Sequence, residues 1–238
     1  MSINKKDSYD FINGEVLLFD KDLDWTSFDL VNRVRILLCR KLNIKKLKVG
    51  HAGTLDPLAS GLMILCTGKS TKLIDTYQAE EKEYIATIKL GATTPSFDME
   101  TGEDSWSDIS EITKTKINLA LEKFKGEIDQ VPPVFSAVKI NGKRAFSYAR
   151  KGETPELQAK KITISELELL AFDLPAITLR IVCSKGTYIR ALARDLGLEL
   201  GCGAYLTQLR RTRVGEFKVE DAMTVSFFSE NLPCFETN

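Results

Sequence analysis

The residues best suited to chemistry lie in one short loop, Val49–Gly61, which contains three glycines, a proline and the only histidine, His51. Asp56 stands immediately before Pro57, a position biased toward extended or turn backbone, so its carboxylate is placed on a loop. Such a carboxylate can act as a nucleophile or as a general acid or base. The alternative is structural, with Asp56 capping the turn that Pro57 begins and His51 an ordinary structural histidine.

Composition narrows the chemistry that is available. The 238 residues include 33 basic and 33 acidic side chains and are 43% hydrophobic, which is typical of a globular protein. One histidine and five scattered cysteines without a C-x-x-C pair make a zinc site hard to assemble and are typical of reduced thiols in a cytosol. The longest apolar stretch, Leu62–Cys66, is too short to span a membrane, and the N-terminus shows no secretory signal. We therefore expect a cytoplasmic protein that uses carboxylates, hydroxyls, lysines and arginines.

Charge is segregated along the chain although the formal net charge is zero. Seven basic residues and no acidic one lie within Arg33–Lys48, and seven more basic residues lie within Lys139–Lys161. Asp98–Glu111 is the reverse, with six acidic residues and no basic one. This pattern favours a polyanionic partner that is bound by patches. The alternative is that each cluster is a solvated face.

The elements that must position these residues alternate between strand-like and helix-like segments. The segments that read as strands are 15–20, 62–66, 84–90, 134–140, 162–172, 177–183, 205–210 and 216–219. The segments that read as helices are 27–42, 69–78, 113–125, 146–150 and 187–200. Runs of strands with helices between them predict a single α+β domain, with a mixed, mostly antiparallel central sheet flanked by helices.

Two other patterns suggest different chemistry. Gly68-Lys69-Ser70 matches the end of a phosphate-binding loop, but the required earlier glycine is replaced by Met63, so a nucleotide site is not expected. Asp56 and Asp98 could instead be the carboxylate pair of a glycosidase, and this alternative stays open.

Six blocks in order carry a family resemblance. The segment Gly50–Gly61 closely resembles the G-H-x-G-x-L-D-P-x-A-x-G loop of the bacterial TruB family of tRNA pseudouridine-55 synthases. Five further blocks follow in family order and extend the resemblance over nearly the whole chain: Glu81-Lys82-Glu83-Tyr84, Gly91-x-x-Thr94-x-x-x-Asp98, Val131-Pro132-Pro133-x-Phe135-Ser136-Ala137-x-Lys139, Gly186-Thr187-Tyr188-Ile189-Arg190 and Leu209-Arg210-Arg211-Thr212.

The resemblance implies a role for individual residues. Asp56 matches the family's nucleophile, Tyr84 the tyrosine that stacks on the flipped base, and Arg190 the arginine that pairs with the nucleophile. The positions that match residues binding or bordering the substrate are His51, Tyr188, Leu209, Lys21 and Lys72. The family's Lys-Pro-x-Gly motif is replaced here by Lys21-Asp22-Leu23-Asp24, which lacks both the proline and the glycine.

The resemblance also implies the pseudouridine synthase fold and the reaction. The expected activity is isomerisation of the T-loop uridine at position 55 of tRNA, by base flipping and by breaking and re-forming the glycosidic bond. That reaction needs no cofactor and no metal. The expected partner is the T-arm and elbow of tRNA, and no protein partner is indicated. The chain ends 26 residues after the Leu209 block, so we expect no PUA domain. An RNA-binding module without activity is the second alternative, although it would have no need of Asp56, Tyr84 and Arg190 together.

Overall fold

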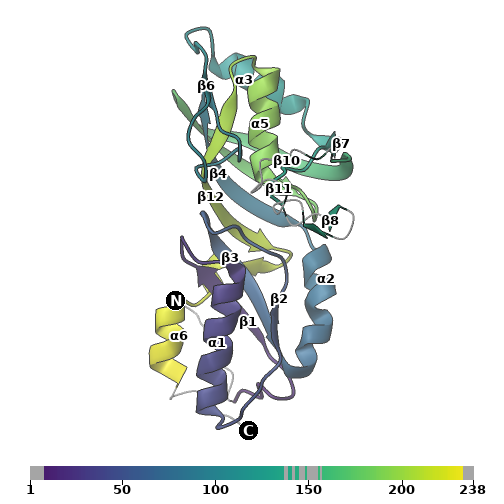
Figure 1. The fold of residues 1–238 in the computed structure, drawn as a ribbon, viewed down its shortest axis with the longest axis vertical. Helices are drawn as coiled ribbons and strands as arrows, with labels where there is room; N and C mark the ends of the chain where they lie inside the picture. Colours follow the sequence, from purple (N-terminus) through teal and green to yellow (C-terminus); the bar gives the residue numbers. More distant parts are fainter. Residues whose placement is uncertain are drawn as a thin grey trace. The chain divides into compact units, whose positions relative to one another are not determined.

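The computed structural model describes residues 8–136, 139–140, 143–144, 148, 155 and 157–232. The chain forms two compact units, residues 1–84 with 210–238 and residues 85–209, and each is described by itself (Figure 1). Strands β4 (Lys82–Leu90) and β12 (Ala204–Val214) contribute residues to both units. The first unit holds the Asp56 loop, and the second holds Arg190.

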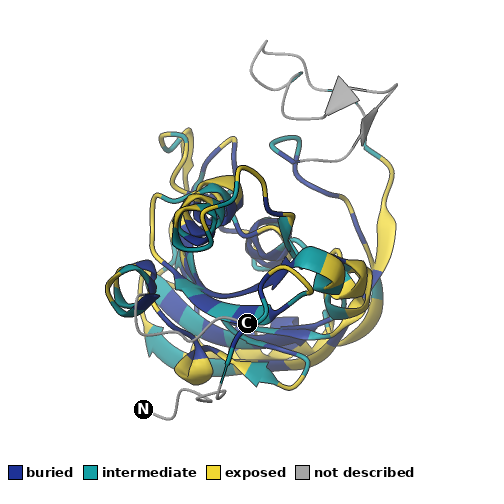
Figure 2. Ribbon diagram, turned by 90° about the horizontal axis from the view of Figure 1, so that it is seen from below, coloured by how far each residue is buried: buried dark blue, intermediate teal, exposed yellow. Residues whose placement is uncertain are grey.

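Strand β3 (Ala59–Thr67) is the centre of the sheet in the first unit. It pairs antiparallel with β1 (Val16–Lys21) and with the short β2 (Val49–His51), and it neighbours β12. Strand β12 forms a hairpin with β13 (Phe217–Lys218). Eight of the nine residues of β3 are buried, and Figure 2 shows how buried and exposed residues are distributed over the strands and helices. The loop between β2 and β3 therefore starts on a partly buried strand and ends on a buried one.

Helix α1 (Ser27–Lys41) is the first helix of the first unit in chain order. Thr26 and Asp29 form a capping box, in which each side chain accepts a hydrogen bond from the main chain of the other, and this satisfies donors that the first turn leaves unpaired. The apolar side of α1 buries Leu30, Val34 and Leu38. The remaining helices of this unit are η1 (Gly68–Leu73), α2 (Ile74–Ala79), η2 (Val219–Asp221) and α6 (Val225–Asn231). Helix α6 packs against α1 and β1.

The second unit is built on an antiparallel hairpin. Strands β10 (Lys160–Asp173) and β11 (Ala176–Cys183) form the hairpin, β7 (Gly126–Gln130) pairs antiparallel with β10, and β4 lies on the other side of β11. Helix α5 (Ile189–Glu199) follows the hairpin and packs against α3 (Lys114–Glu122). Two small pairs complete the unit: β5 (Ala92–Thr93) with β6 (Ser105–Trp106), and β8 (Lys139–Ile140) with β9 (Lys143–Arg144).

These elements confirm the predicted α+β class with flanking helices. The seven pairings named above are all antiparallel, and an isolated parallel bridge joins Phe19 to Met223. The predicted helix over 69–78 is wrong in its first half, which is the 3₁₀ helix η1, and residues 134–136 form bends instead of the predicted strand. Strands β2 and β7 and helix α6 were not predicted, because short segments lack a clear hydrophobic period. The predicted helix over 146–150 lies almost entirely outside the described residues.

Two further expectations can be compared with the structure. No disulfide joins any two of the described cysteines Cys39, Cys66, Cys183 and Cys202, and Cys234 lies outside the described residues. Within the described part of the chain, no helix is both long and apolar enough to cross a membrane.

Candidate active site

The loop that carries Asp56 is held on both sides of that residue. The Ser27 hydroxyl accepts a hydrogen bond from the Leu55 N–H and donates one to the Leu55 carbonyl, each at 2.9 Å. The Asp24 N–H donates to the Pro57 carbonyl at 2.9 Å. Asp56 is half-buried between these fixed points, and its own carbonyl accepts a hydrogen bond from the Ala59 N–H. A carboxylate on a loop tied at both neighbours is preorganised for a reaction.

Lys21 lies at the end of β1 and is 1% exposed. Its ammonium donates to the carbonyls of Asp22 and Trp25, at 2.8 and 2.7 Å. Asp24 adopts a φ of 64°, the left-handed conformation that glycine provides in the family motif and that aspartate tolerates better than most residues. The loop therefore closes around Lys21 without the glycine.

Burial lowers the pKa of Lys21 from 10.5 to about 8. The negative charges of Asp56, Asp22 and Asp24 oppose this shift, and the positive charge of Arg211 adds to it. The charge of Lys21 and that of Asp56 thus act on one another, and the role of Lys21 beside the substrate stays a prediction.

This pKa predicts a dependence of stability on pH. Between about pH 8 and 10.5, the unfolded chain binds the proton that folded Lys21 has released, so the free energy of unfolding rises with pH. Over this range, wild type should gain stability relative to Lys21→Met, which has no proton to lose. Urea unfolding of both proteins at several pH values measures the difference. Parallel stability profiles would show that Lys21 is not desolvated in the fold.

His51 ends β2 and is partly buried. Its Nδ1 atom is buried and has no hydrogen-bond partner among the described residues. Burial lowers the pKa of His51, the positive charge of Arg211 adds to this effect, and a hydrogen bond with the Gly53 main chain opposes it. The imidazole is therefore favoured in its neutral form, which can accept a hydrogen bond from a ligand.

The other two predicted residues of the first unit differ in burial. Tyr84 is 8% exposed and follows the alternating burial of β4. Lys72 lies on η1 and is exposed. The Tyr84 side chain is thus mostly buried, whereas the Lys72 ammonium lies at the surface.

In the second unit, Arg190 is 5% exposed and lies at the start of α5. Its Nε atom is 3.4 Å from Asp98 Oδ2, and its Nη1 and Nη2 atoms donate to the carbonyls of Ser96 and Phe135 at 3.3 and 3.0 Å. These contacts fix the plane of the guanidinium. The pairing of Arg190 with Asp56 stays a prediction, since the two residues belong to different units.

Tyr188 and Leu209 complete the predicted set. The Tyr188 main chain is held by the buried Gln130 side chain, whose Oε1 accepts from the Tyr188 N–H at 2.8 Å and whose Nε2 donates to the Tyr188 carbonyl at 3.1 Å. Leu209 is 9% exposed on β12. Tyr188, which immediately precedes α5, is therefore held in place through its main chain.

The sequence prediction did not assign four residues that hold these side chains: Ser27, Arg211, Asp98 and Gln130. Arg211 and Asp98 lie within the recognised blocks, and their position there was the available signal, because their burial is visible only in the fold. Ser27 is the first residue of a predicted helix, and no local pattern shows that its hydroxyl reaches Leu55. Among the described residues, no group of three His, Cys, Asp or Glu side chains could hold a metal ion.

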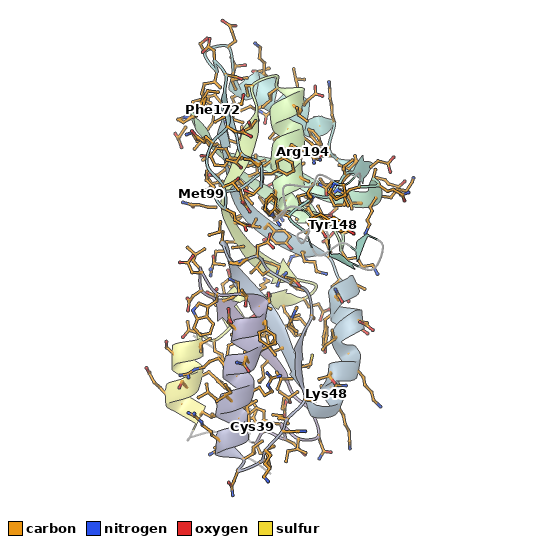
Figure 3. The ribbon with its side chains drawn as sticks, viewed as in Figure 1. Cys39, Lys48, Met99, Tyr148, Phe172 and Arg194 are labelled. Carbon is orange, nitrogen blue, oxygen red and sulfur yellow. The ribbon has the colours of Figure 1, made fainter. Side chains whose placement is uncertain are left out.

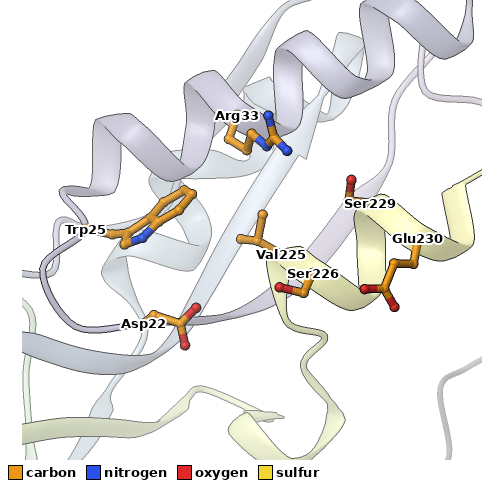
Figure 4. Close-up of a pocket in the computed structure, with 7 residues that line it drawn as sticks. All are labelled: Asp22, Trp25, Arg33, Val225, Ser226, Ser229 and Glu230. Carbon is orange, nitrogen blue, oxygen red and sulfur yellow. The ribbon is translucent and has the colours of Figure 1, made fainter.

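A cavity of about 480 Å³ opens beside α6 in the first unit (Figure 4). Its lining residues are Asp22, Trp25, Arg33, Val225, Ser226, Ser229 and Glu230, and no predicted site residue is among them. Trp25 faces this cavity with its ring, while its carbonyl binds Lys21. Acidic and basic side chains both line the cavity, so its charge favours no one class of ligand.

The basic cluster within Arg33–Lys48 lies on α1 and on the segment before β2. Arg33, Arg40, Lys45, Lys46 and Lys48 are exposed, and Figure 3 shows Lys48 on this segment. These cations are available to a polyanion. Most of the second cluster, within Lys139–Lys161, lies outside the described residues.

Comparison with known proteins assigns most of the chain to two family models. Residues 40–189 match the N-terminal domain of TruB family pseudouridylate synthases, and residues 190–236 match the tRNA pseudouridylate synthase B C-terminal domain. The protein named tRNA pseudouridine synthase B from Phocaeicola vulgatus is 59% identical, over 92% of this chain and 94% of the relative. The protein of that name from Flavobacterium johnsoniae is 48% identical, over 94% of this chain and 98% of the relative.

Solved structures show a similar fold. A chain in the crystal structure of a Cbf5-Nop10-Gar1 complex matches with a TM-score of 0.69 and 29% identity, and covers 93% of this chain. A chain in the structure of an H/ACA RNP bound to a substrate RNA containing 2′-deoxyuridine matches with a TM-score of 0.66 and 27% identity. This chain spans 55% and 53% of those two chains.

Proposed function

The chain belongs to the TruB family of tRNA pseudouridine synthases, and from this premise we propose that it isomerises the T-loop uridine at position 55 of tRNA with Asp56 as the nucleophile. The observation that supports this role is the Asp56 loop, which is fixed through Leu55 and Pro57 on either side of the carboxylate. We place this activity in the cytoplasm, where bacterial tRNA is found.

The reaction breaks the bond between ribose C1′ and uracil N1 and forms a bond between C1′ and C5. The base turns between these steps, the hydrogen on C5 leaves as a proton, and N1 gains a proton, so the product is an isomer of the substrate. The sugar carbon loses electron density when N1 departs. A fixed carboxylate can support such a centre by covalent or ion-pair contact. We assign this task to Asp56.

The target uridine must leave its stack to reach the carboxylate, which costs about a few kcal/mol. We propose that the Tyr84 ring offsets part of this cost, since stacking of a base on an aromatic ring contributes about 1–3 kcal/mol. His51, Tyr188, Leu209, Lys21 and Lys72 would bind or border the flipped nucleotide.

The Tyr84 assignment gives a prediction with two variants. Tyr84→Leu should reduce the rate of pseudouridine formation by about 10-fold to 100-fold, because it removes the ring. Tyr84→Phe keeps the ring and should cost much less. Single-turnover rates with unmodified tRNA measure both. If the Phe variant is as slow as the Leu variant, the hydroxyl is the essential group and the stacking role is wrong.

Recognition of tRNA is proposed to use the exposed cations of α1 and the segment before β2. Contacts to phosphates release counterions, so affinity should fall steeply as salt rises. The T-arm and elbow of tRNA are the part that we expect this surface to bind. An isolated T-arm stem-loop should then be modified nearly as well as whole tRNA.

Nucleoside analysis of unmodified tRNA after incubation with the protein tests the proposed function. We expect pseudouridine in the RNA and no free base. Free uracil would indicate the glycosidase alternative, and tight RNA binding without any product would indicate the binding-module alternative.

A further inference from the structure

Arg211 is a buried arginine on β12 to which the proposed mechanism gives no task. It is 1% exposed and is the largest fully buried side chain among the described residues. Removing a charge from water costs several kcal/mol unless polar contacts replace the lost hydration. The hydrogen bonds of Arg211 therefore show which parts of the chain its guanidinium holds together.

All three hydrogen bonds from the guanidinium go to main-chain carbonyls. Nε donates to Leu62 on β3 at 2.7 Å, Nη2 donates to Gly53 at 3.2 Å, and Nη1 donates more weakly to Thr54 at 3.5 Å. Within the described part of the chain, no carboxylate forms an ion pair with Arg211. The planar fork thus connects strand β3 to the loop, two and three residues before Asp56.

Two glycines lie against Arg211. Gly61 lies against it so closely that a Cβ atom on Gly61 would be 2.2 Å from the Arg211 carbonyl oxygen. Gly53 has a φ of 106°, which favours glycine, and a Cβ there would meet Nη1 at 3.7 Å. Gly61 therefore lets β3 approach the main chain of residue 211 closely, and Gly53 supplies the left-handed backbone of the loop beside the guanidinium.

The neighbouring arginine serves as an internal comparison. Successive side chains on a strand point to opposite faces, and Arg210 makes a bidentate ion pair with Asp20, at 3.0 and 2.7 Å. Arg210 is thus held by a carboxylate, whereas Arg211 donates its hydrogen bonds to main-chain carbonyls of the loop and of β3. The charge of Arg211 also reaches Lys21 and His51, whose pKa values it lowers.

We propose that Arg211 is a positioning residue for the isomerase reaction, whose guanidinium holds Gly53 and Thr54 against β3 and thereby sets the direction of Asp56. This inference rests on the proposed function. Arg211 acts through the loop backbone and does not itself contact the reacting atoms. Lysine cannot replace it, because a single ammonium on a flexible stem does not reproduce a planar fork that reaches three carbonyls.

The test compares Arg211→Lys with Arg213→Lys. Arg213 lies on the same strand, and its guanidinium binds Glu81 and the Gly215 carbonyl but not the loop. Arg211→Lys should lower the single-turnover rate of pseudouridine formation by about 100-fold, the effect expected when a reacting group shifts by about 1 Å. Its dissociation constant for unmodified tRNA should stay at the wild-type value, and Arg213→Lys should match wild type in both measurements.

Two further measurements distinguish a positioning role of Arg211 from a loss of the folded state. The rate is divided by the folded fraction, which is measured by urea unfolding under the assay conditions. Because His51 is the only histidine, its NMR titration reports on the loop without ambiguity, and its signal should shift in Arg211→Lys and stay in place in Arg213→Lys. If the corrected rate of Arg211→Lys equals that of wild type, the positioning role is overturned and Arg211 is structural only. If wild type itself makes no pseudouridine, the proposed function fails, and this inference fails with it.

Discussion

Asp56→Asn is expected to abolish pseudouridine formation while leaving affinity for tRNA unchanged. The substitution keeps the shape of the side chain and removes its charge and nucleophilicity, so the rate should fall by at least about 10⁴-fold. Binding should persist because phosphate contacts dominate affinity for RNA, and the exposed cations of α1 are untouched. Single-turnover assays and binding titrations with unmodified tRNA measure the two quantities.

Asp75→Asn is a matched control for this variant. Asp75 is an exposed aspartate on α2, and its substitution should change neither quantity. Pseudouridine above background from purified Asp56→Asn would show that the carboxylate is not the nucleophile. A loss of tRNA binding equal to the loss of rate would show that Asp56 is a binding group.

Arg190→Lys should lower the rate by about 10²–10³-fold although the charge is kept. The Arg190 guanidinium contacts the Asp98 carboxylate and two main-chain carbonyls in a buried site, and lysine cannot make these contacts at once. Asp98→Asn should also be slow, since it leaves a buried guanidinium without its charge partner. Single-turnover rates, corrected for the folded fraction, measure both effects.

Arg180→Lys is the control for Arg190→Lys. Arg180 pairs with Glu166 and Glu168 on the partly exposed face of the β10–β11 hairpin, and exposed ion pairs contribute little. The rate of pseudouridine formation by Arg180→Lys should match that of wild type. A normal rate in Arg190→Lys would mean that the geometry of the guanidinium does not matter, and a normal rate in Asp98→Asn would mean that this ion pair does not position it.

The sequence predicted the elements with strong periodicity and the residues inside recognisable motifs. The predicted helix over 27–42 is confirmed as α1, which buries Val31, Val34 and Leu38. The long strands β10 and β11 were found close to their observed bounds, because β-branched residues and Pro175 mark the hairpin clearly.

The supporting contacts could not be predicted, because they join residues far apart in the sequence. Arg211 reaches Gly53 across 158 positions, and Gln130 reaches Tyr188 across 58. Such pairs depend on which strands become neighbours, and this is a property of the whole fold. The left-handed conformation of Asp24 is a local feature, but it follows from the closure of its loop on Lys21 and Pro57.

Release of tritium from tRNA labelled at uracil C5 tests whether the protein isomerises the uridine at position 55 by means of Asp56. Forming the C1′–C5 bond displaces the hydrogen on C5, so each isomerised uridine loses its label to water. We compare unmodified tRNA with the same tRNA in which the uridine at position 55 is replaced by cytidine. We expect release from the first RNA by wild type, and none from the second RNA or by Asp56→Asn. Equal release from both RNAs, or no release from either, would contradict this expectation.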